Sequence, residues 1–317
     1  MKNNFLKVHP ELQQIAKKTP KINFGKNTLW LVNLLMALMP TPKTPQDVII
    51  ENTTISGQNE QPKVRLRIYK PKAIRTPTPV LIWLHGGGYV MGKPEMDDLR
   101  CTEYVRELGI TVVSVNYRRA PKHPFPAALD DSYAALKWVA AQAQQLNVDA
   151  QRIAIGGGSA GSGLAAALAQ LAHDRQEVTP IFQLLIYPML DDRTALRSDI
   201  DDSNNVTWTQ KLNRFGWESY LRQPCGAQDV PAYAVPARRA DLSGLPPAWI
   251  GVGSLDIFHD EDVAYAQRLT ACGVACEINI VPAAFHGFDV FNPQLPIVQA
   301  FWKSQIAALK KHLLLSV

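Results

Sequence analysis

Cysteine, long apolar runs and clustered charge are all scarce in this sequence. Its 317 residues include four cysteines, with no C-x-x-C spacing and no histidine cluster beside them, which argues against a metal site or a disulfide framework. Free thiols fit a reducing compartment, so we expect a cytoplasmic protein. The net charge is only +5, and lysine and arginine are scattered along the chain, so the composition does not indicate nucleic-acid binding.

A run long enough to span a membrane is also lacking. Residues 29–39 are apolar and follow four lysines, but the run is too short to cross a bilayer comfortably and is followed by Pro40. A signal peptide would place its apolar region nearer the start, with small residues at a cleavage site. We expect no stable membrane insertion and an amphipathic helix that packs on the protein; a peripheral contact with a membrane surface is the alternative.

Apolar runs and helical patterns alternate along most of the chain. Residues 47–55 and 63–69 are typical of an exposed antiparallel pair of strands. Continuous apolar runs, typical of buried strands in a mostly parallel sheet, lie at 79–84, 110–115, 152–155, 181–186, 248–252 and 277–281. Helical patterns lie at about 96–108, 127–146, 160–174, 259–272 and 295–313. This order predicts a doubly wound α/β domain.

The alternation is interrupted between Pro188 and Leu245. Several aspartates give way there to aromatic residues at loosely helical spacing, and no strand pattern is present. We expect an inserted helical lid over the carboxyl edge of the sheet, because the binding crevices of α/β domains lie at that edge. A helical excursion that only covers core is the alternative.

A G-x-S-x-G pattern spans residues 157–161, between an apolar run and a helical pattern. The order strand, sharp turn, helix is that of a nucleophile elbow, which makes Ser159 a candidate nucleophile. The pentapeptide alone is weak evidence, since a capping serine in a glycine-rich turn has the same look. A serine hydroxyl also needs a base, a carboxylate that orients the base, and donors for an oxyanion.

The base and the acid are expected on loops after late strands, in the chain order serine, acid, histidine of α/β hydrolases. His286 follows the last predicted strand and has a glycine beside it, whereas the other six histidines lie in terminal helical stretches, at helix ends or in loops elsewhere. Asp256 comes just after the strand at 248–252. Asp260 and Glu261 are more typical of the first turn of the next helix. We therefore predict Asp256 as the acid and His286 as the base.

The oxyanion donors have a signature of their own in His85-Gly86-Gly87-Gly88, at the end of a buried strand. Consecutive glycines let backbone N–H groups approach a substrate oxygen, and the pattern predicts Gly87 and Gly88 as donors together with Ala160. A phosphate cradle is the alternative, but no Walker lysine follows. The aromatic candidates for a substrate pocket are Tyr89, Trp208, Phe215 and Trp217.

Together these motifs resemble those of the hormone-sensitive-lipase-like carboxylesterases of the α/β-hydrolase fold. The similarity covers roughly residues 45–317 and includes 116–128, 241–247 and 253–256. It implies a mostly parallel eight-stranded sheet flanked by helices, and hydrolysis of short- to medium-chain acyl esters without cofactor or metal. By the same resemblance, residues 116–128 are structural support whose charged members pair internally.

The resemblance also implies a domain organisation. Residues 46–188 and 244–317 would form the catalytic domain, and 189–243 would form a helical cap to which the N-terminal helical segment, 1–45, contributes. A homodimer through the last strand and the helix after it is a further expectation at the level of the family.

Two positions depart from the family pattern. Gly158 stands where the family usually has aspartate, which bears on the rigidity of the elbow and on activity; residues 256–260 read D-I-F-H-D where D-P-L-R-D is common. A small-molecule receptor on the same fold is one alternative, as plant gibberellin receptors resemble this family without the catalytic histidine. The presence of His286 argues for an enzyme, although amides, carbamates and lactones are hydrolysed by the same machinery.

Overall fold

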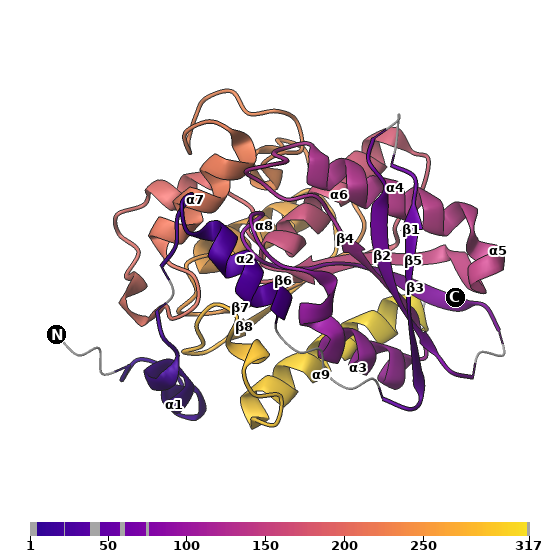
Figure 1. Ribbon diagram of the computed structural model, residues 1–317, viewed down its shortest axis with the longest axis horizontal. Coiled ribbons are helices and arrows are strands. Elements are labelled where there is room, and N and C mark those ends of the chain that lie inside the picture. Colours follow the sequence, from indigo (N-terminus) through magenta and orange to yellow (C-terminus); the bar gives the residue numbers. More distant parts are fainter. Residues whose placement is uncertain (1–4, 22, 39–44, 58–60, 74–75, 316–317) are drawn as a thin grey trace.

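A twisted sheet forms the centre of the molecule (Figure 1). The structure is a computed structural model, and it describes residues 5–21, 23–38, 45–57, 61–73 and 76–315. Within these residues the sheet has eight strands in the order β1-β2-β4-β3-β5-β6-β7-β8. The strands are β1 (Val48–Ile55), β2 (Val64–Pro71), β3 (Thr78–Leu84), β4 (Thr111–Asn116), β5 (Val148–Gly158), β6 (Phe182–Ile186), β7 (Ala248–Gly253) and β8 (Cys276–Val281).

The sheet is mostly parallel, as predicted. β2 runs antiparallel to both β1 and β4, and the remaining neighbours are parallel. Every residue of β3, β6 and β7 is buried, which explains why these strands are continuous apolar runs in the sequence. The expected eight-stranded, doubly wound α/β architecture is therefore confirmed.

Helices cover both faces of the sheet. One face packs against α3 (Asp98–Leu108) and α9 (Pro296–Leu313), and the short N-terminal helix α1 (Pro10–Lys18) lies on the same side. The other face packs against α4 (Ala127–Ala141), α5 (Ala143–Leu146), α6 (Ala160–Arg175) and α8 (His259–Ala271). Successive residues of the central strands point to opposite faces, so β3 supplies Leu81 and Trp83 to the first layer and Val80, Ile82 and Leu84 to the second.

The segment between β6 and β7 is less helical than we expected. It contains one α-helix, α7 (Gln210–Leu221), and short 3-10 turns: η2 (Asp192–Leu196), η3 (Asp202–Asn204) and η4 (Pro236–Arg238). Trp208 lies before the helix, because Thr209 caps it by accepting a hydrogen bond from the Leu212 N–H at 3.3 Å. Trp208 is therefore not on the same helix as the later aromatic residues of the segment, although their spacing is loosely helical.

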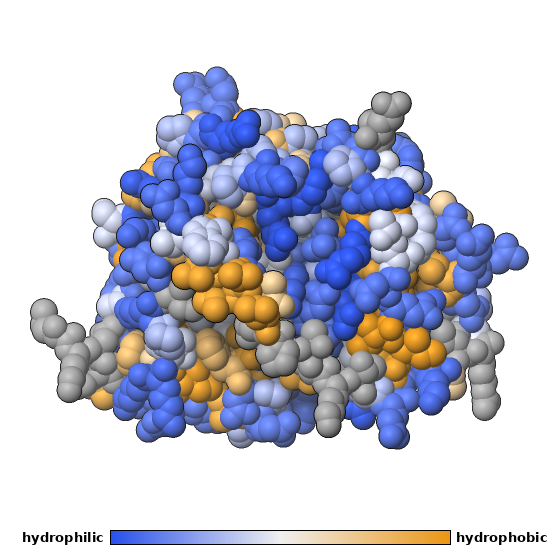
Figure 2. Space-filling view, in the orientation of Figure 1, coloured by the Kyte–Doolittle hydropathy of each residue, from blue (hydrophilic) through white to orange (hydrophobic). Residues whose placement is uncertain are grey.

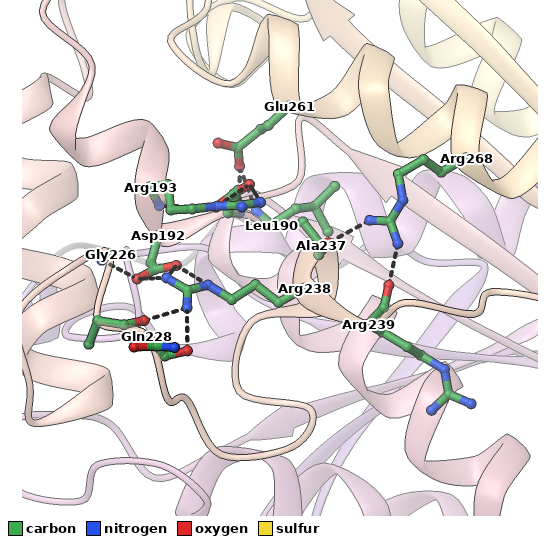
Figure 3. Close-up of polar contacts among 12 residues, drawn as sticks. Leu190, Asp192, Arg193, Gly226, Gln228, Ala237, Arg238, Arg239, Glu261 and Arg268 are labelled. Atoms are coloured by element: carbon green, nitrogen blue, oxygen red, sulfur yellow. Dashed lines mark hydrogen bonds and ion pairs between the residues drawn. The ribbon is translucent and has the colours of Figure 1, made fainter.

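Buried polar contacts fix the base of this segment to the sheet domain (Figure 3). Asp192 is fully buried and pairs with the Arg238 guanidinium at 2.8 Å. The Glu261 carboxylate of α8 accepts a hydrogen bond from the Leu190 N–H at 2.6 Å, and Arg268 of the same helix donates to backbone carbonyls of the segment. The Asp192–Arg238 pair joins the two ends of the segment to each other, whereas Glu261 and Arg268 connect the segment to α8 through its backbone.

The apolar run near the N-terminus forms a helix, α2 (Leu29–Leu38), but the helix is not amphipathic. It contacts the protein through buried Leu29 and half-buried Val32 and Met36. The opposite side is also apolar and is exposed; it consists of Trp30, Leu31, Leu34, Leu35 and Leu38. Our expectation of an amphipathic helix is therefore wrong, since the polar face that such a helix turns to water is absent. None of the described helices has the combined length and apolar character needed to cross a bilayer.

Candidate active site

Ser159 sits at the sharp turn that joins β5 to α6. Its backbone has φ 56° and ψ −121°, a region that residues with a side chain rarely occupy. The turn is held from both sides, because the Ser159 N–H donates to the Ile186 carbonyl at 2.9 Å and the Ser159 carbonyl accepts from the Gly163 N–H at 3.0 Å. This over-determined geometry keeps a strained residue in place at the end of the strand.

The neighbouring glycines make the turn possible. A Cβ at Gly157 would lie 2.4 Å from the Leu84 carbonyl oxygen, and one at Gly161 would lie 2.0 Å from the same atom. The end of β3 therefore packs directly on the turn, and a larger residue at either position would push the two apart.

Three side chains form a hydrogen-bonded row at this turn. His286 Nε2 lies 2.9 Å from Ser159 Oγ, and His286 Nδ1 lies 2.7 Å from Asp256 Oδ2. All three residues are buried. Because the carboxylate can only accept, Nδ1 carries the proton and donates it, which leaves Nε2 free to accept the serine proton. The structure thus brings together the three residues that the sequence analysis singled out.

The surroundings hold the imidazole and the carboxylate in position. The rings of Tyr187 and Phe258 meet the His286 ring edge-on, with centroids 4.7 and 5.1 Å away. The Phe258 N–H donates to Asp256 Oδ1 at 3.0 Å, so each carboxylate oxygen has its own partner. The Thr207 hydroxyl donates to the His286 carbonyl at 2.6 Å, which ties the histidine loop to the segment between β6 and β7.

The expected oxyanion donors lie beside the serine. Gly87 and Gly88 have φ of 120° and 58°, so both conformations favour glycine. Within the described residues, the N–H groups of Gly87, Gly88 and Ala160 donate to no other protein group. A Cβ at Gly88 would lie 2.0 Å from the ring of Trp208. The arrangement leaves three unused donors next to the serine, where an anionic oxygen could bind.

A cleft of about 150 Å³ opens onto the serine. Its lining residues are Gly86, Gly87, Gly88, Met91, Met96, Asp97, Arg100, Gly158, Ser159, Tyr187, Thr207, Trp208, His286, Gly287 and Val290. Met91, Met96, Trp208 and Val290 contribute apolar side chains to the lining, so part of the cleft fits a small apolar group.

Only one of the four aromatic candidates lines this cleft. Trp208 does, whereas Tyr89 and Trp217 are fully buried core residues whose ring centroids lie 5.3 Å apart. Phe215 packs edge-on against Phe24 of the N-terminal segment at 5.9 Å. These three residues pack against other aromatic side chains and do not line the cleft.

The sequence analysis missed a buried polar cluster in the wall of the cleft, to which Asp97, Arg100 and Tyr187 belong. The Tyr187 hydroxyl donates to Asp289 at 2.8 Å, and the Arg100 guanidinium donates to the other oxygen of the same carboxylate at 2.8 Å. Asp97 accepts from the Trp83 indole N–H at 2.8 Å, and burial raises the pKa of the Asp97 carboxyl. The sequence offered one indication of this cluster: Tyr187 comes directly after a buried strand, at the edge of the sheet where sites form.

Gly158 leaves open space beside the serine. An added Cβ there would meet only one atom within 4 Å, Cε2 of Tyr187 at 3.9 Å. Steric crowding therefore does not explain the glycine, because an aspartate side chain would have room to start from this position.

Comparison with known proteins identifies the family. A family model described as alpha/beta hydrolase fold matches residues 81–290. The chain belongs to this family. The hydrolase is 35% identical to carboxylesterase NlhH of Mycobacterium tuberculosis over 292 residues, which is 89% of this chain and 90% of the relative. It is 34% identical to the ethyl acetate hydrolase of Pseudomonas putida, over 74% of this chain and 73% of that one.

Solved structures agree with this assignment. A bacterial heroin esterase matches the hydrolase with a TM-score of 0.90 and 34% identity, covering 98% of this chain and 99% of its own. The resemblance to hormone-sensitive-lipase-like carboxylesterases that the motifs indicated is thereby confirmed. So is the α/β-hydrolase fold.

Proposed function

We propose that this protein is a serine carboxylesterase that hydrolyses short- to medium-chain acyl esters through Ser159, His286 and Asp256. The observation that carries the proposal is the hydrogen-bonded row from Asp256 to Ser159 at 2.7 and 2.9 Å, next to three backbone donors without partners. This is the arrangement that acyl transfer needs: a nucleophile, its base, an orienting carboxylate and an oxyanion site.

The chemistry follows from these positions. Ser159 Oγ attacks the ester carbonyl while His286 Nε2 takes the hydroxyl proton, and Asp256 stabilises the imidazolium that forms. The N–H groups of Gly87, Gly88 and Ala160 stabilise the negative oxygen of the tetrahedral intermediate. His286 then gives its proton to the leaving alcohol, which leaves an acyl-enzyme. Water, deprotonated by the same imidazole, attacks the acyl group and regenerates Ser159.

The size of the cleft supports small acyl groups. Its volume of about 150 Å³ is below the range of roughly 300–1,000 Å³ that is common for small-molecule sites. Trp208, Met91 and Met96 give it an apolar wall. The relative named ethyl acetate hydrolase acts, by its name, on an ester of this size.

We further propose that residues 1–45 and 189–243 together form a cap over the catalytic domain. Phe24 from the first segment packs on Trp208 and Phe215 of the second, with centroids 6.4 and 5.9 Å away. Because Trp208 also lines the cleft, movement of this cover would change access to Ser159. The four cysteines are unpaired, which supports a cytoplasmic location.

The decisive experiment is a substrate panel with a serine variant. Aryl esters of increasing acyl length should be hydrolysed by the wild type, and Ser159→Ala should lower the turnover by at least about 10⁴-fold. Ser243→Ala, at an exposed serine, is the matched control and should retain full activity. An organophosphate should label Ser159 and no other residue.

The same panel separates the alternatives. A wild type that hydrolyses no activated ester, yet binds small molecules, would support a receptor and overturn the proposal. Faster hydrolysis of a matched amide, carbamate or lactone than of the ester would keep the triad but reassign the substrate class.

A further inference from the structure

Helix α2 has an apolar outer face that the described part of the molecule leaves uncovered. Trp30, Leu31, Leu34, Leu35 and Leu38 are between 43% and 72% exposed. The space-filling view shows an orange, hydrophobic patch over α2 (Figure 2). A helix that is apolar all round normally lies in a core or against lipid, so this face calls for a partner.

A strongly basic cleft adjoins this helix. It has a volume of about 600 Å³ and is bounded on one side by Leu29, Trp30 and Asn33 of α2. Its cationic lining residues are Lys26, Lys63, Arg65, Arg118, Arg119 and Lys122, and no acidic residue lines it. In Figure 2 hydrophilic residues fill the surface directly beside the α2 patch.

Three of these cations are free to meet an external anion. Arg65 pairs with Glu95 at 3.0 Å, Arg118 pairs with Asp131 at 2.8 Å, and Arg119 donates to the Gly92 carbonyl. Lys26, Lys63 and Lys122 are exposed, and no ion pair to them exists within the described ranges.

Helix α2 is joined to a loop that lines the catalytic cleft. Two contacts join α2 to the loop that follows the glycine run: the Asn33 amide donates to the Val90 carbonyl at 3.4 Å, and Lys93 Nζ donates to the Ala37 carbonyl at 3.3 Å. That loop supplies Met91 and Met96 to the lining of the cleft, and Met96 is 45% exposed. α2 and the start of α3 lie on the same face in Figure 1.

We propose that this face docks on an anionic lipid surface. The outer side of α2 enters the boundary between headgroups and acyl chains, and Lys26, Lys63 and Lys122 meet the negative headgroups. Apolar burial and cationic attraction together give reversible binding without a spanning segment. In this orientation the catalytic cleft opens toward the membrane, so esters dissolved in the bilayer reach Ser159 directly. This last step rests on the proposed esterase function.

Sedimentation with lipid vesicles tests the proposal on the full-length protein. The wild type should bind phosphatidylcholine vesicles that contain phosphatidylglycerol at least tenfold more tightly than phosphatidylcholine alone, and salt should weaken this binding. Leu34→Ser with Leu35→Ser should lower the binding at least tenfold, because it removes the inserting side chains. Lys26→Glu with Lys122→Glu should lower it at least twentyfold, at about fivefold or more for each lysine.

Matched controls remove the same kinds of side chain elsewhere. Leu196→Ser is at an exposed leucine of the segment between β6 and β7, and Lys310→Glu is at an exposed lysine near the end of α9. Both should bind vesicles within twofold of the wild type. Circular dichroism and thermal melting of every variant separate a lost surface from a lost fold.

Two outcomes would overturn the proposal. One is an absence of wild-type binding to the anionic vesicles, or binding that neither double variant weakens. The other is a dimer that dissociates when Leu34 and Leu35 are replaced, since a second copy would then cover α2. Hydrolysis of a water-soluble aryl ester by the wild type without vesicles reports on the esterase function separately.

Discussion

Asp256→Asn is the substitution that tests the proposed mechanism most severely, because it changes one atom of the hydrogen-bonded row. The Phe258 N–H donates to Oδ1 of Asp256 and requires an acceptor there. In the variant, the amide oxygen therefore keeps the Oδ1 position and the NH₂ group takes the Oδ2 position, 2.7 Å from His286 Nδ1. An NH₂ group donates, so Nδ1 must accept and the ring proton moves to Nε2.

An imidazole with its proton on Nε2 cannot accept the proton of Ser159. The loss in kcat should therefore be about 10⁴-fold, the size found for this change in a serine protease triad. It corresponds to about 5 kcal/mol in the activation barrier. The fold should persist, because asparagine has the same shape and keeps the hydrogen bond from the Phe258 N–H.

Initial rates on a p-nitrophenyl ester, with thermal melting as the check on folding, measure the effect. Asp260→Asn is the matched control: Asp260 lies four residues away, its side chain is 56% exposed, and it pairs with Arg197 at 2.7 Å. That variant should retain its activity. A folded Asp256→Asn protein with kcat within tenfold of the wild type would refute the assignment of the acid.

Three further predictions concern single positions. Gly158→Asp should fold with a free energy of unfolding within about 1 kcal/mol of the wild type in urea unfolding, since the position is open. Gly88→Ala should cost at least about 2 kcal/mol more than Gly109→Ala in urea unfolding, because both have positive φ but only the first meets a side chain. Burial raises the pKa of Asp262 well above its ordinary value. The unfolded chain therefore releases this proton at lower pH than the folded protein does, so the free energy of unfolding falls as pH rises, by up to about 1.4 kcal/mol per pH unit. Asp262→Asn should show a smaller fall between pH ~5 and pH ~8, and an unchanged fall would contradict the argument.

The strands could be predicted from the sequence because burial on both faces leaves a continuous apolar run. The strand expected at 152–155 shows the limit of this pattern, because the apolar run covers only part of the strand that forms. The structure extends β5 to Val148–Gly158, and the added residues include Asp149 and Gln151 at one end and three glycines at the other. The first of them pairs with β3 only through Thr78 and Val148, after a shift of register. Such residues join the strand through backbone pairing, which hydrophobic patterns do not report.

The row of Ser159, Asp256 and His286 could be predicted for a topological reason. The carboxyl ends of parallel strands meet at one edge of the sheet, so residues just after different strands come together there. The cleft wall does not follow this rule. Trp217 is on a helix whose aromatic residues could face either the core or the cleft, and the choice depends on how α7 packs. Arg100 and Asp289 lie 189 residues apart in the chain, and only the packing of α3 beside the histidine loop brings them together.

The turn at Ser159 also shows that one short motif can record two unrelated constraints. Gly157 and Gly161 are fixed by contact with the backbone of β3, so these letters of the pattern describe how a strand and a turn touch. Gly158 is fixed by no such contact, and it is the position at which the sequence departs from the pattern that the resemblance implies. A motif search that weights all glycines equally therefore does not separate residues required for packing from residues that affect the reaction. For enzyme engineering the distinction points to position 158, where a side chain can be added beside the nucleophile without rebuilding the turn.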